Sequence, residues 1–256
     1  MKKISIYLIA TCFISLSSTA AHSQSKLEKI LKKVTTKPAA SKSTATSATG
    51  TPTTSEMGFG IKEALEIGIS RGTDLLSAKD GFLGNAAVKI LFPPEAQKVE
   101  RTLRSIGMGS LADNVILSLN RAAEDAAKEA KPIFVSAIKQ MTITDVTNIL
   151  LGQQDAATSY FKRVTTSQLM EKFQPVITTS LNKVGAAKYW GDAAGQYNKI
   201  PLVKPVSTDL SSYVAQKAID GMFIQVAQEE LKIRGSLGAR STPLLQKVFG
   251  YADQKK

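Results

Sequence analysis

The sequence predicts an all-α protein in which a single multi-helix globular bundle follows a signal peptide and a disordered tether. Apolar residues recur at helical spacing almost throughout residues 57–250, and no segment shows the alternation typical of a half-buried strand. Residues 37–55 are almost entirely Thr, Ser, Ala, Pro and Lys, so they lack the apolar surface that offsets the entropy lost on ordering. The expected divisions are a signal peptide at 1–23, a basic leader and tether at 24–56, an all-helical domain at 57–250 and a tail at 251–256.

The first residues have the parts of a secretory signal. Lys2 and Lys3 supply the positive start, residues 4–16 are predominantly apolar, and residues 21–23 (Ala-His-Ser) have the small residues that precede a signal-peptidase cut. A membrane-spanning helix needs about 20 apolar residues, so we expect cleavage after residue 23 and no integral span in the mature chain. The signal predicts an exported protein of the periplasm or outer envelope. Lipid attachment at Cys12 is a minor alternative, because the residues before it match the acylation pattern poorly.

The leader contains a pattern typical of a small cationic amphipathic helix. Its apolar residues recur at i, i+3, i+4 and i+7 with lysines between them: Leu27, Ile30, Leu31 and Val34 alternate with Lys26, Lys29, Lys32 and Lys33. So short a helix is marginal in water, whereas an anionic membrane surface favours its formation. A frayed basic leader is the alternative interpretation.

The first helix of the domain has two glycines on its apolar stripe. The stripe consists of Ile61, Ala64, Leu65, Gly68, Gly72, Leu75 and Leu76. Glycine inside a helix costs about 1 kcal/mol relative to alanine, so Gly68 and Gly72 predict that another helix approaches closely there. Asp80-Gly81 then predicts a turn.

Start and stop signals divide the rest of the domain into further helices. Pro93-Pro94-Glu95 predicts a helix start, and that helix ends near Gly107. Ser110 with Asp113 resembles a capping box at the start of the longest clear helix, residues 111–130, which Pro132 ends or kinks. Further starts are expected at Thr142 with Asp145, at Asp155, at Thr166 or Ser167, at Thr208, and at Thr242 before Pro243.

Residues 213–233 form the expected central helix. Its apolar residues cover most of its circumference, a pattern typical of a buried helix. They are Val214, Ala218, Ile219, Met222, Phe223, Ile224, Val226 and Ala227. The two prolines of residues 200–206 predict a loop that leads to this helix.

The histidine and cysteine content excludes several classes of chemistry. The single His22 and the single Cys12 both belong to the predicted signal, so the folded domain has neither imidazole nor thiol. Ser-His-Asp hydrolysis, Cys-His catalysis and most transition-metal sites are therefore excluded. The sequence also has no phosphate-binding glycine loop and no dinucleotide motif, so it predicts no catalytic residue, no metal site and no cofactor.

The charge balance favours anionic partners. The formal net charge is +12, and loss of Lys2 and Lys3 with the signal lowers it to +10. In an exported protein this balance favours anionic lipid, anionic glycan or an envelope protein as partner, and does not favour nucleic acid. Charge that serves solubility alone is the alternative.

Three groups of polar residues are the candidate binding residues. The first is Asn120, Arg121 and Glu124, which can form either a polar network that fixes helix register or the polar end of a ligand pocket. The second is Tyr160, Lys162 and Arg163, which can contact a sugar or a lipid headgroup, or form one buried aromatic face and one solvated basic face. The third is Asp220, the acid expected to be most desolvated, since it interrupts the apolar centre of a long helix. Pairing of Asp220 with Lys217 or with an arginine across the core is its alternative role.

Several motifs resemble a known family. They are Gly60-Ile61-Lys62-Glu63-Ala64-Leu65, Leu117-Ser118-Leu119-Asn120-Arg121-Ala122-Ala123-Glu124, Ala130-Lys131-Pro132-Ile133-Phe134, Ala137-Ile138-Lys139-Gln140-Met141, Tyr160-Phe161, Lys217-Ala218-Ile219-Asp220-Gly221, Gln228-Glu229-Glu230 and Lys247-Val248-Phe249-Gly250. Over residues 58–250 the chain resembles the exported bacterial family numbered 4197 among domains of unknown function. The resemblance implies a helical envelope protein and carries over no catalytic residue.

Three functional hypotheses follow from the sequence. The first is a non-enzymatic module that binds a lipid, a glycan or a protein partner through a groove or a basic face. The second is a hydrolase or lyase of envelope glycan that uses Asp220 or Glu124 as its acid. The third is a structural or assembly protein that oligomerises through the face of Gly68 and Gly72. The sequence does not predict the oligomeric state.

Overall fold

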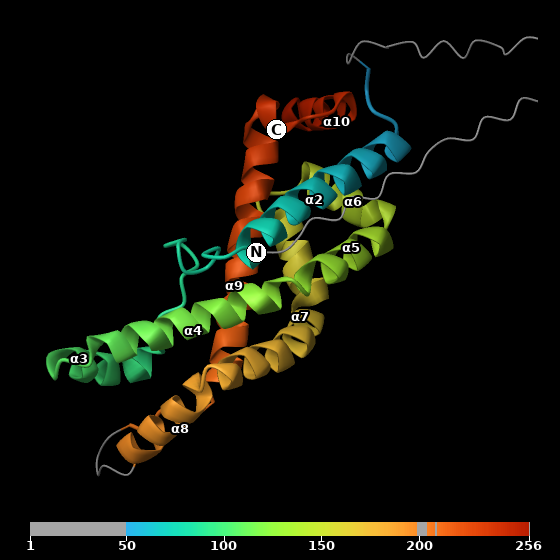
Figure 1. Cartoon of the computed structure of the whole chain (residues 1–256). Helices are drawn as coiled ribbons and strands as arrows, with labels where there is room; N and C mark the ends of the chain where they lie inside the picture. The colour runs from blue at the N-terminus through green and yellow to red at the C-terminus, as the bar shows by residue number, and fades with distance from the viewer. Residues whose placement is uncertain (1–49, 199–203, 208, 256) are drawn as a thin grey trace, which may run out of the picture. The chain divides into compact units, whose positions relative to one another are not determined.

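The computed structural model describes residues 50–198, 204–207 and 209–255, which form helices joined by loops (Figure 1). In chain order the elements are α2 (Thr54–Ser77), η1 (Pro94–Ala96), α3 (Gln97–Ser105), α4 (Gly109–Ala127), α5 (Ala130–Gln140), α6 (Ile143–Leu151), α7 (Ala156–Lys183), α8 (Ala186–Tyr197), α9 (Leu210–Gly235), η2 (Leu237–Ala239) and α10 (Pro243–Asp253). The described residues contain no β-strand, which confirms the all-α class. The predicted signal peptide, the leader and most of the tether lie outside the described residues.

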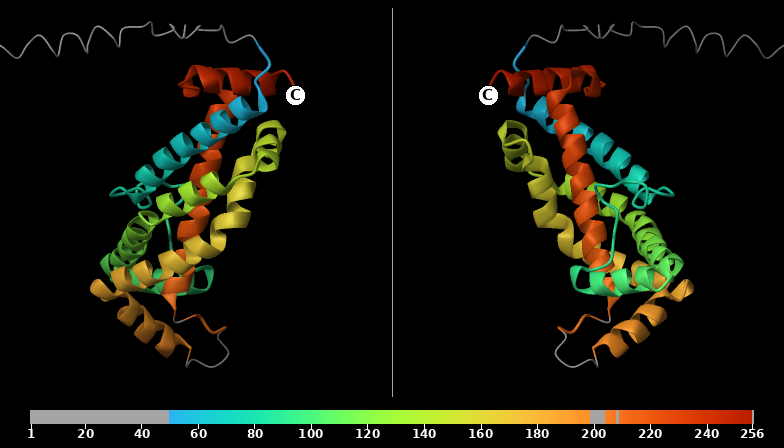
Figure 2. Two further views of the ribbon diagram at one scale, coloured as in Figure 1. Left: turned by 90° about the vertical axis from the view of Figure 1, so that its right-hand side faces the viewer. Right: turned by 90° about the vertical axis from the view of Figure 1, so that its left-hand side faces the viewer.

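The central helix of the bundle is α9, as its apolar circumference predicted. Helices α7, α2 and α4 pack around it, and Figures 1 and 2 show it crossing between them. The fully or almost fully buried side chains on it include Val214, Ala215, Ala218, Ile219 and Met222. Burial of one large apolar side chain stabilises a fold by about 1.5–3 kcal/mol, so α9 contributes much of the core.

The glycines of α2 allow α9 to approach closely. A Cβ atom at Gly72 would lie 3.1 Å from Cγ of Gln225, and one at Gly68 would lie 3.4 Å from Cβ of Glu229. The predicted close contact is confirmed, and its partner is a helix of the same chain. Because α9 already covers this face, the hypothesis that the chain oligomerises through Gly68 and Gly72 is wrong. The prediction that Leu75 belongs to the buried stripe is also wrong, since its side chain is 50% exposed.

Side chains cap several helix starts. Thr142 Oγ1 accepts a hydrogen bond from the Asp145 N–H at 3.1 Å, and the Asp145 carboxylate accepts one from the Thr142 N–H at 2.9 Å, which is the predicted capping box. Thr242 caps α10 as predicted. An unpredicted capping box between Thr53 and Glu56 starts α2 inside the segment assigned to the tether, and α10 continues into the segment assigned to the tail.

Other predicted capping residues are wrong. α4 begins at Gly109 without a side-chain cap, and Asp113 instead pairs with Arg104 at 2.8 Å. Thr166 lies inside α7, where its hydroxyl donates to the Lys162 carbonyl oxygen at 2.6 Å. A hydroxyl that suggested a cap therefore forms a bond one turn back along a continuous helix. The cap expected at Thr208 falls on a residue outside the described ranges. The structure shows that Asp209 caps α9.

A buried ion pair on α9 joins the end of α6 to the start of α7. Glu230 and Arg234 lie one turn apart at 2.8 Å, and each side chain is 5% exposed. The Glu230 carboxylate accepts the N–H groups of Ala157 and Thr158 at 2.9 Å in the first turn of α7. The Arg234 guanidinium donates to the carbonyl oxygen of Ile149 at 2.6 Å, near the end of α6. The pair thus satisfies backbone groups that helix ends leave without partners.

Gly221 of α9 is expected to tolerate no larger residue. A Cβ atom there would lie 2.7 Å from the Phe82 ring and 3.3 Å from Cβ of Val88, and the Phe82 ring is fully buried. Gly221→Ala should therefore lower the free energy of unfolding by about 1–3 kcal/mol through overpacking, measured by urea unfolding. The control is Gly58→Ala, where no atom lies within 4 Å and a gain of up to about 1 kcal/mol is expected. Equal effects at the two positions would contradict this packing argument.

Candidate functional site

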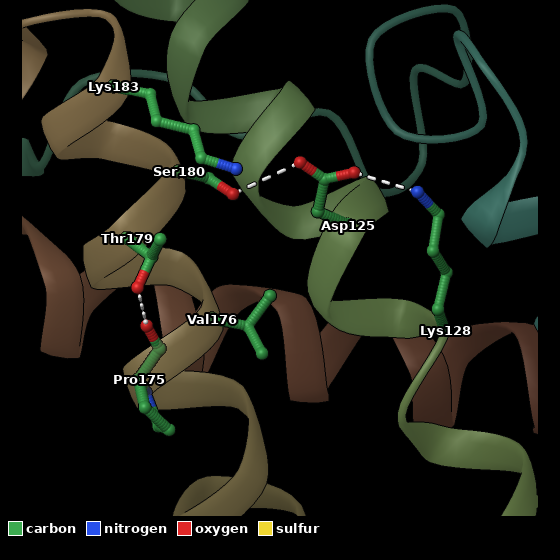
Figure 3. Close-up of a pocket in the computed structure, with 7 residues that line it drawn as sticks. All are labelled: Asp125, Lys128, Pro175, Val176, Thr179, Ser180 and Lys183. Atoms are coloured by element: carbon green, nitrogen blue, oxygen red, sulfur yellow. Dashed lines mark hydrogen bonds and ion pairs between the residues drawn. The ribbon is translucent and has the colours of Figure 1, made fainter.

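A groove with a volume of about 430 Å³ lies between α4 and α7 (Figure 3). Its lining consists of Asp125, Lys128, Pro175, Val176, Thr179, Ser180 and Lys183. Two of these residues come from the end of α4 and the other five from the second half of α7. The groove therefore depends on the packing of two helices far apart in the sequence.

Asp125 links the two sides of the groove. Its carboxylate accepts a hydrogen bond from Lys128 Nζ at 2.8 Å and from the Ser180 hydroxyl at 3.0 Å, as Figure 3 shows. The pKa of this carboxyl is lowered, first because Lys128 donates to it and then because Ser180 does, and the nearby charge of Lys183 adds to this effect. Asp125 is therefore ionised at neutral pH and is a weak base.

The two lysines are positioned by helix ends. Lys128 is the C-cap of α4 and Lys183 is the last residue of α7, and cations are stabilised near the negative end of a helix dipole. Pro175 removes one N–H from the hydrogen-bond ladder of α7, and α7 bends along its length in Figure 1. The Thr179 hydroxyl donates to the Pro175 carbonyl oxygen at 2.8 Å, so its own proton is already used.

The groove offers free cationic donors beside a small apolar surface. Lys183 forms no ion pair with any residue that the structure describes, and Lys128 has one carboxylate partner. An ammonium group has three N–H donors, so both lysines keep donors for an added anion. Val176 and Pro175 supply the apolar part of the lining. This arrangement can bind a phosphate or carboxylate group by charge and hydrogen bonding, without a covalent step.

The first sequence-predicted group, Asn120, Arg121 and Glu124, holds a loop against α4. Asn120 is fully buried, accepts the Ile90 N–H at 2.8 Å and donates to the Ile90 carbonyl oxygen at 2.8 Å. Glu124 is also buried and accepts the Phe82 N–H at 3.2 Å, while Arg121 pairs with Glu124. These contacts fit the polar-network interpretation. A ligand-binding role for the three residues stays a prediction.

Two residues of the second group lie together beside a smaller cleft. The cleft has a volume of about 200 Å³ and is lined by Ala137, Gln140, Asp145, Tyr160, Arg163, Val164 and Gln168. The Arg163 guanidinium lies 5.3 Å from the centre of the Tyr160 ring. Burial and the charge of Asp145 raise the pKa of Tyr160. Hydrogen bonds from Thr142 lower the pKa of Asp145, and the charge of Arg163 lowers it further.

The remaining predicted residues lie elsewhere. Lys162 is next to Arg163 in sequence but its Nζ lies 5.8 Å from the centre of the Phe223 ring on α9. Asp220 is exposed and accepts a hydrogen bond from Gln216 at 2.9 Å. The expectation that Asp220 is desolvated or paired in the core is therefore wrong, because α9 is not buried around its whole circumference at that position.

The residues of the α4–α7 groove are not among those that the sequence predicted. Asp125 and Lys128 are three residues apart, a spacing that pairs opposite charges on a helix. This spacing was the one local pattern in the sequence that could have pointed to the groove. Their partners on α7 had no such signal, because the predicted start at Thr166 or Ser167 divided that helix in two. The groove depends on a contact between distant segments, which the sequence pattern does not specify.

None of the described helices is both long and apolar enough to cross a membrane. A family model described as "Protein of unknown function (DUF4197)" matches residues 51–250. Comparison with curated proteins and with solved structures found no match.

Proposed function

Since this chain belongs to the DUF4197 family of proteins of unknown function, we propose from its own geometry that it is a non-enzymatic binding protein for an anionic ligand. The phosphate or carboxylate group of the ligand binds the remaining ammonium donors of Lys128 and Lys183 in the α4–α7 groove, beside Asp125. The observation that carries the proposal is that two helices each contribute a lysine to one open groove, while Asp125 supplies a single carboxylate between them.

The proposed setting is the cell envelope. The predicted signal peptide directs the chain to export, and the net charge of +10 after its removal favours anionic lipids and glycans over other partners. An envelope protein that presents an anionic surface is the third partner class. All three share the phosphate or carboxylate chemistry that the groove accepts.

The alternative of a carboxylate-dependent hydrolase or lyase has weaker support. A general acid of this kind needs a raised pKa. The pKa values of Asp125, which lines the α4–α7 groove, and of Asp145, which lines the cleft beside Tyr160, are instead lowered. Of the two acids first considered, Asp220 is exposed and Glu124 accepts backbone N–H groups of the loop. Turnover of a glycan that stops on replacement of one acid, without unfolding, would restore this alternative.

Removal of Lys183 is expected to weaken anion binding. The probe is butyl phosphate, titrated into the purified protein and followed by NMR, with shifts expected first at the amides of Lys128, Ser180 and Lys183. Lys183→Gln should raise the dissociation constant about three- to fivefold, because an exposed charge pair contributes up to about 1 kcal/mol. The affinity should also fall with added salt.

The matched control is Lys217→Gln on α9, where the lysine lies near the Tyr213 ring and outside the groove. This variant removes the same charge and should leave the dissociation constant unchanged. If both variants weaken binding equally, general charge attraction and not the groove is responsible, and the proposal fails.

A further inference from the structure

An apolar trough lies between α4 and the α7–α8 junction, which Val184 and Ala186 form. This second hollow has a volume of about 300 Å³, and its apolar lining includes Leu111, Leu117, Val184 and Ala186. Leu117 is 38% exposed and Val184 is 58% exposed. Both side chains present apolar surface to solvent at the trough.

The groove and the trough lie on the same side of the helix pair. On α4, Leu111, Ser118 and Asp125 are seven residues apart, which places them on one face of the helix. On the facing side, Ser180 bonds Asp125, and Val184 lies one turn farther along beside Ser118. The two helices therefore run in opposite directions, and the groove and the trough lie one after the other along the same face of α4. Leu111 and Asp125 are about 20 Å apart along α4.

The character of the lining changes along this face of α4. At the Asp125 end, two lysines, two hydroxyls and one carboxylate surround the groove. At the Leu111 end, the lining is mainly aliphatic and holds no charged residue. A ligand that matches both parts has an anionic group at one end and a hydrocarbon chain at the other.

We propose that the groove and the trough together bind one molecule of an anionic amphiphile, such as a lipid with a phosphate or carboxylate headgroup. The headgroup binds the remaining donors of Lys128 and Lys183, and the acyl chain extends along Leu111, Leu117 and Val184. The charge complementarity at one end and the alignment of the two hollows along one face of α4 select this occupant over a second copy of the chain. The inference rests on the proposed function, because the headgroup occupies the proposed anion site.

A series of alkyl phosphates tests the inference. Butyl, octyl and dodecyl phosphate are titrated calorimetrically into the purified protein, each at a concentration where it is monomeric. A fully buried methylene strengthens binding about fourfold. For an alkyl chain that lies half-buried in an open trough, the affinity should therefore rise about twofold with each added methylene. An affinity that is the same for all three would overturn the amphiphile inference and leave the anion site intact. Binding of none of them would overturn the proposed function itself.

Substitutions in the trough separate chain binding from headgroup binding. Leu117→Gln with Val184→Gln should abolish the gain with chain length and leave the affinity for butyl phosphate unchanged. Ile143→Gln, at a residue that is 66% exposed on α6, is the matched control and should leave the whole series unchanged. Loss of butyl phosphate binding in the trough variant, with its circular dichroism spectrum preserved, would contradict the assignment of headgroup and chain.

Two further readouts distinguish other occupants of the trough. Binding to vesicles that contain an anionic phospholipid, without binding of monomeric dodecyl phosphate, would show a membrane-docking surface and overturn the single-molecule site. A dimer that dissociates in the trough variant, measured by analytical ultracentrifugation, would show that a second copy covers the trough. A monomer that binds dodecyl phosphate with one-to-one stoichiometry is the result expected.

Discussion

Replacement of Glu230 by alanine is expected to lower the free energy of unfolding by about 3–5 kcal/mol, because it leaves Arg234 as a buried charge without its carboxylate partner. The substitution also removes the acceptor for the N–H groups of Ala157 and Thr158 at the start of α7. The free energy is obtained from urea unfolding followed by circular dichroism. Faster hydrogen exchange at those two amides would locate the damage at the first turn of α7.

The control for this substitution is Asp220→Ala on the same helix. Asp220 is exposed and, among the described residues, bonds only to the side chain of Gln216, so the change should stay within about 0.5 kcal/mol. If Glu230→Ala lowers the free energy of unfolding no more than Asp220→Ala does, then water replaces the carboxylate and the Glu230–Arg234 pair does not hold the α6–α7 junction.

Replacement of Asn120 by alanine should be the second most damaging change, with a loss of about 3 kcal/mol. The Asn120 amide pairs with both the N–H and the carbonyl oxygen of Ile90, each at 2.8 Å in the fully buried interior. Alanine leaves both backbone groups unsatisfied, and each unsatisfied buried group costs about 1–3 kcal/mol. The measurement is again urea unfolding, together with limited proteolysis of the loop between α2 and η1.

Asn114→Ala is the matched control, since Asn114 lies on the same helix and is exposed. It should change the free energy of unfolding by less than about 0.5 kcal/mol and leave the proteolysis pattern unchanged. If Asn120→Ala leaves the loop resistant to protease, then the loop is held by the apolar contacts of Phe82 and Ile90 and not by this amide.

The sequence predicted most helices because helical periodicity and capping are local signals. Thr142 with Asp145 and Thr242 before Pro243 both cap helices in the structure. The signal failed at Ser110, since the helix there starts without a side-chain cap. It also failed at Thr166, because a threonine hydroxyl can bond either forward as a cap or back along a helix, and only the tertiary packing of α7 decides between the two.

The start of α7 shows a different limit of local signals. Asp155 occupies the predicted N-cap position but makes no side-chain cap bond, and Glu230 supplies the oxygen atoms from α9. A cap supplied by a distant helix leaves no local pattern in the sequence.

The candidate site was less predictable than the fold. The sequence indicated polar residues on apolar stripes, and two of these, Asn120 and Glu124, hold a loop in the structure. Tyr160 and Arg163 do line a cleft. The α4–α7 groove was not predicted, because in the sequence its lysines look like those of any solvated helix face. Only the packing of the two helices brings them together.

The cap that Glu230 provides has a consequence for how the chain acquires its structure. Ala157 and Glu230 are 73 residues apart, so during synthesis the first turn of α7 has no carboxylate partner until Glu230 has left the ribosome. Contacts of such sequence separation form late and slow the search for the native state. We therefore expect residues 50–198 alone to stay loosely structured, because the carboxylate that caps α7 lies outside that fragment.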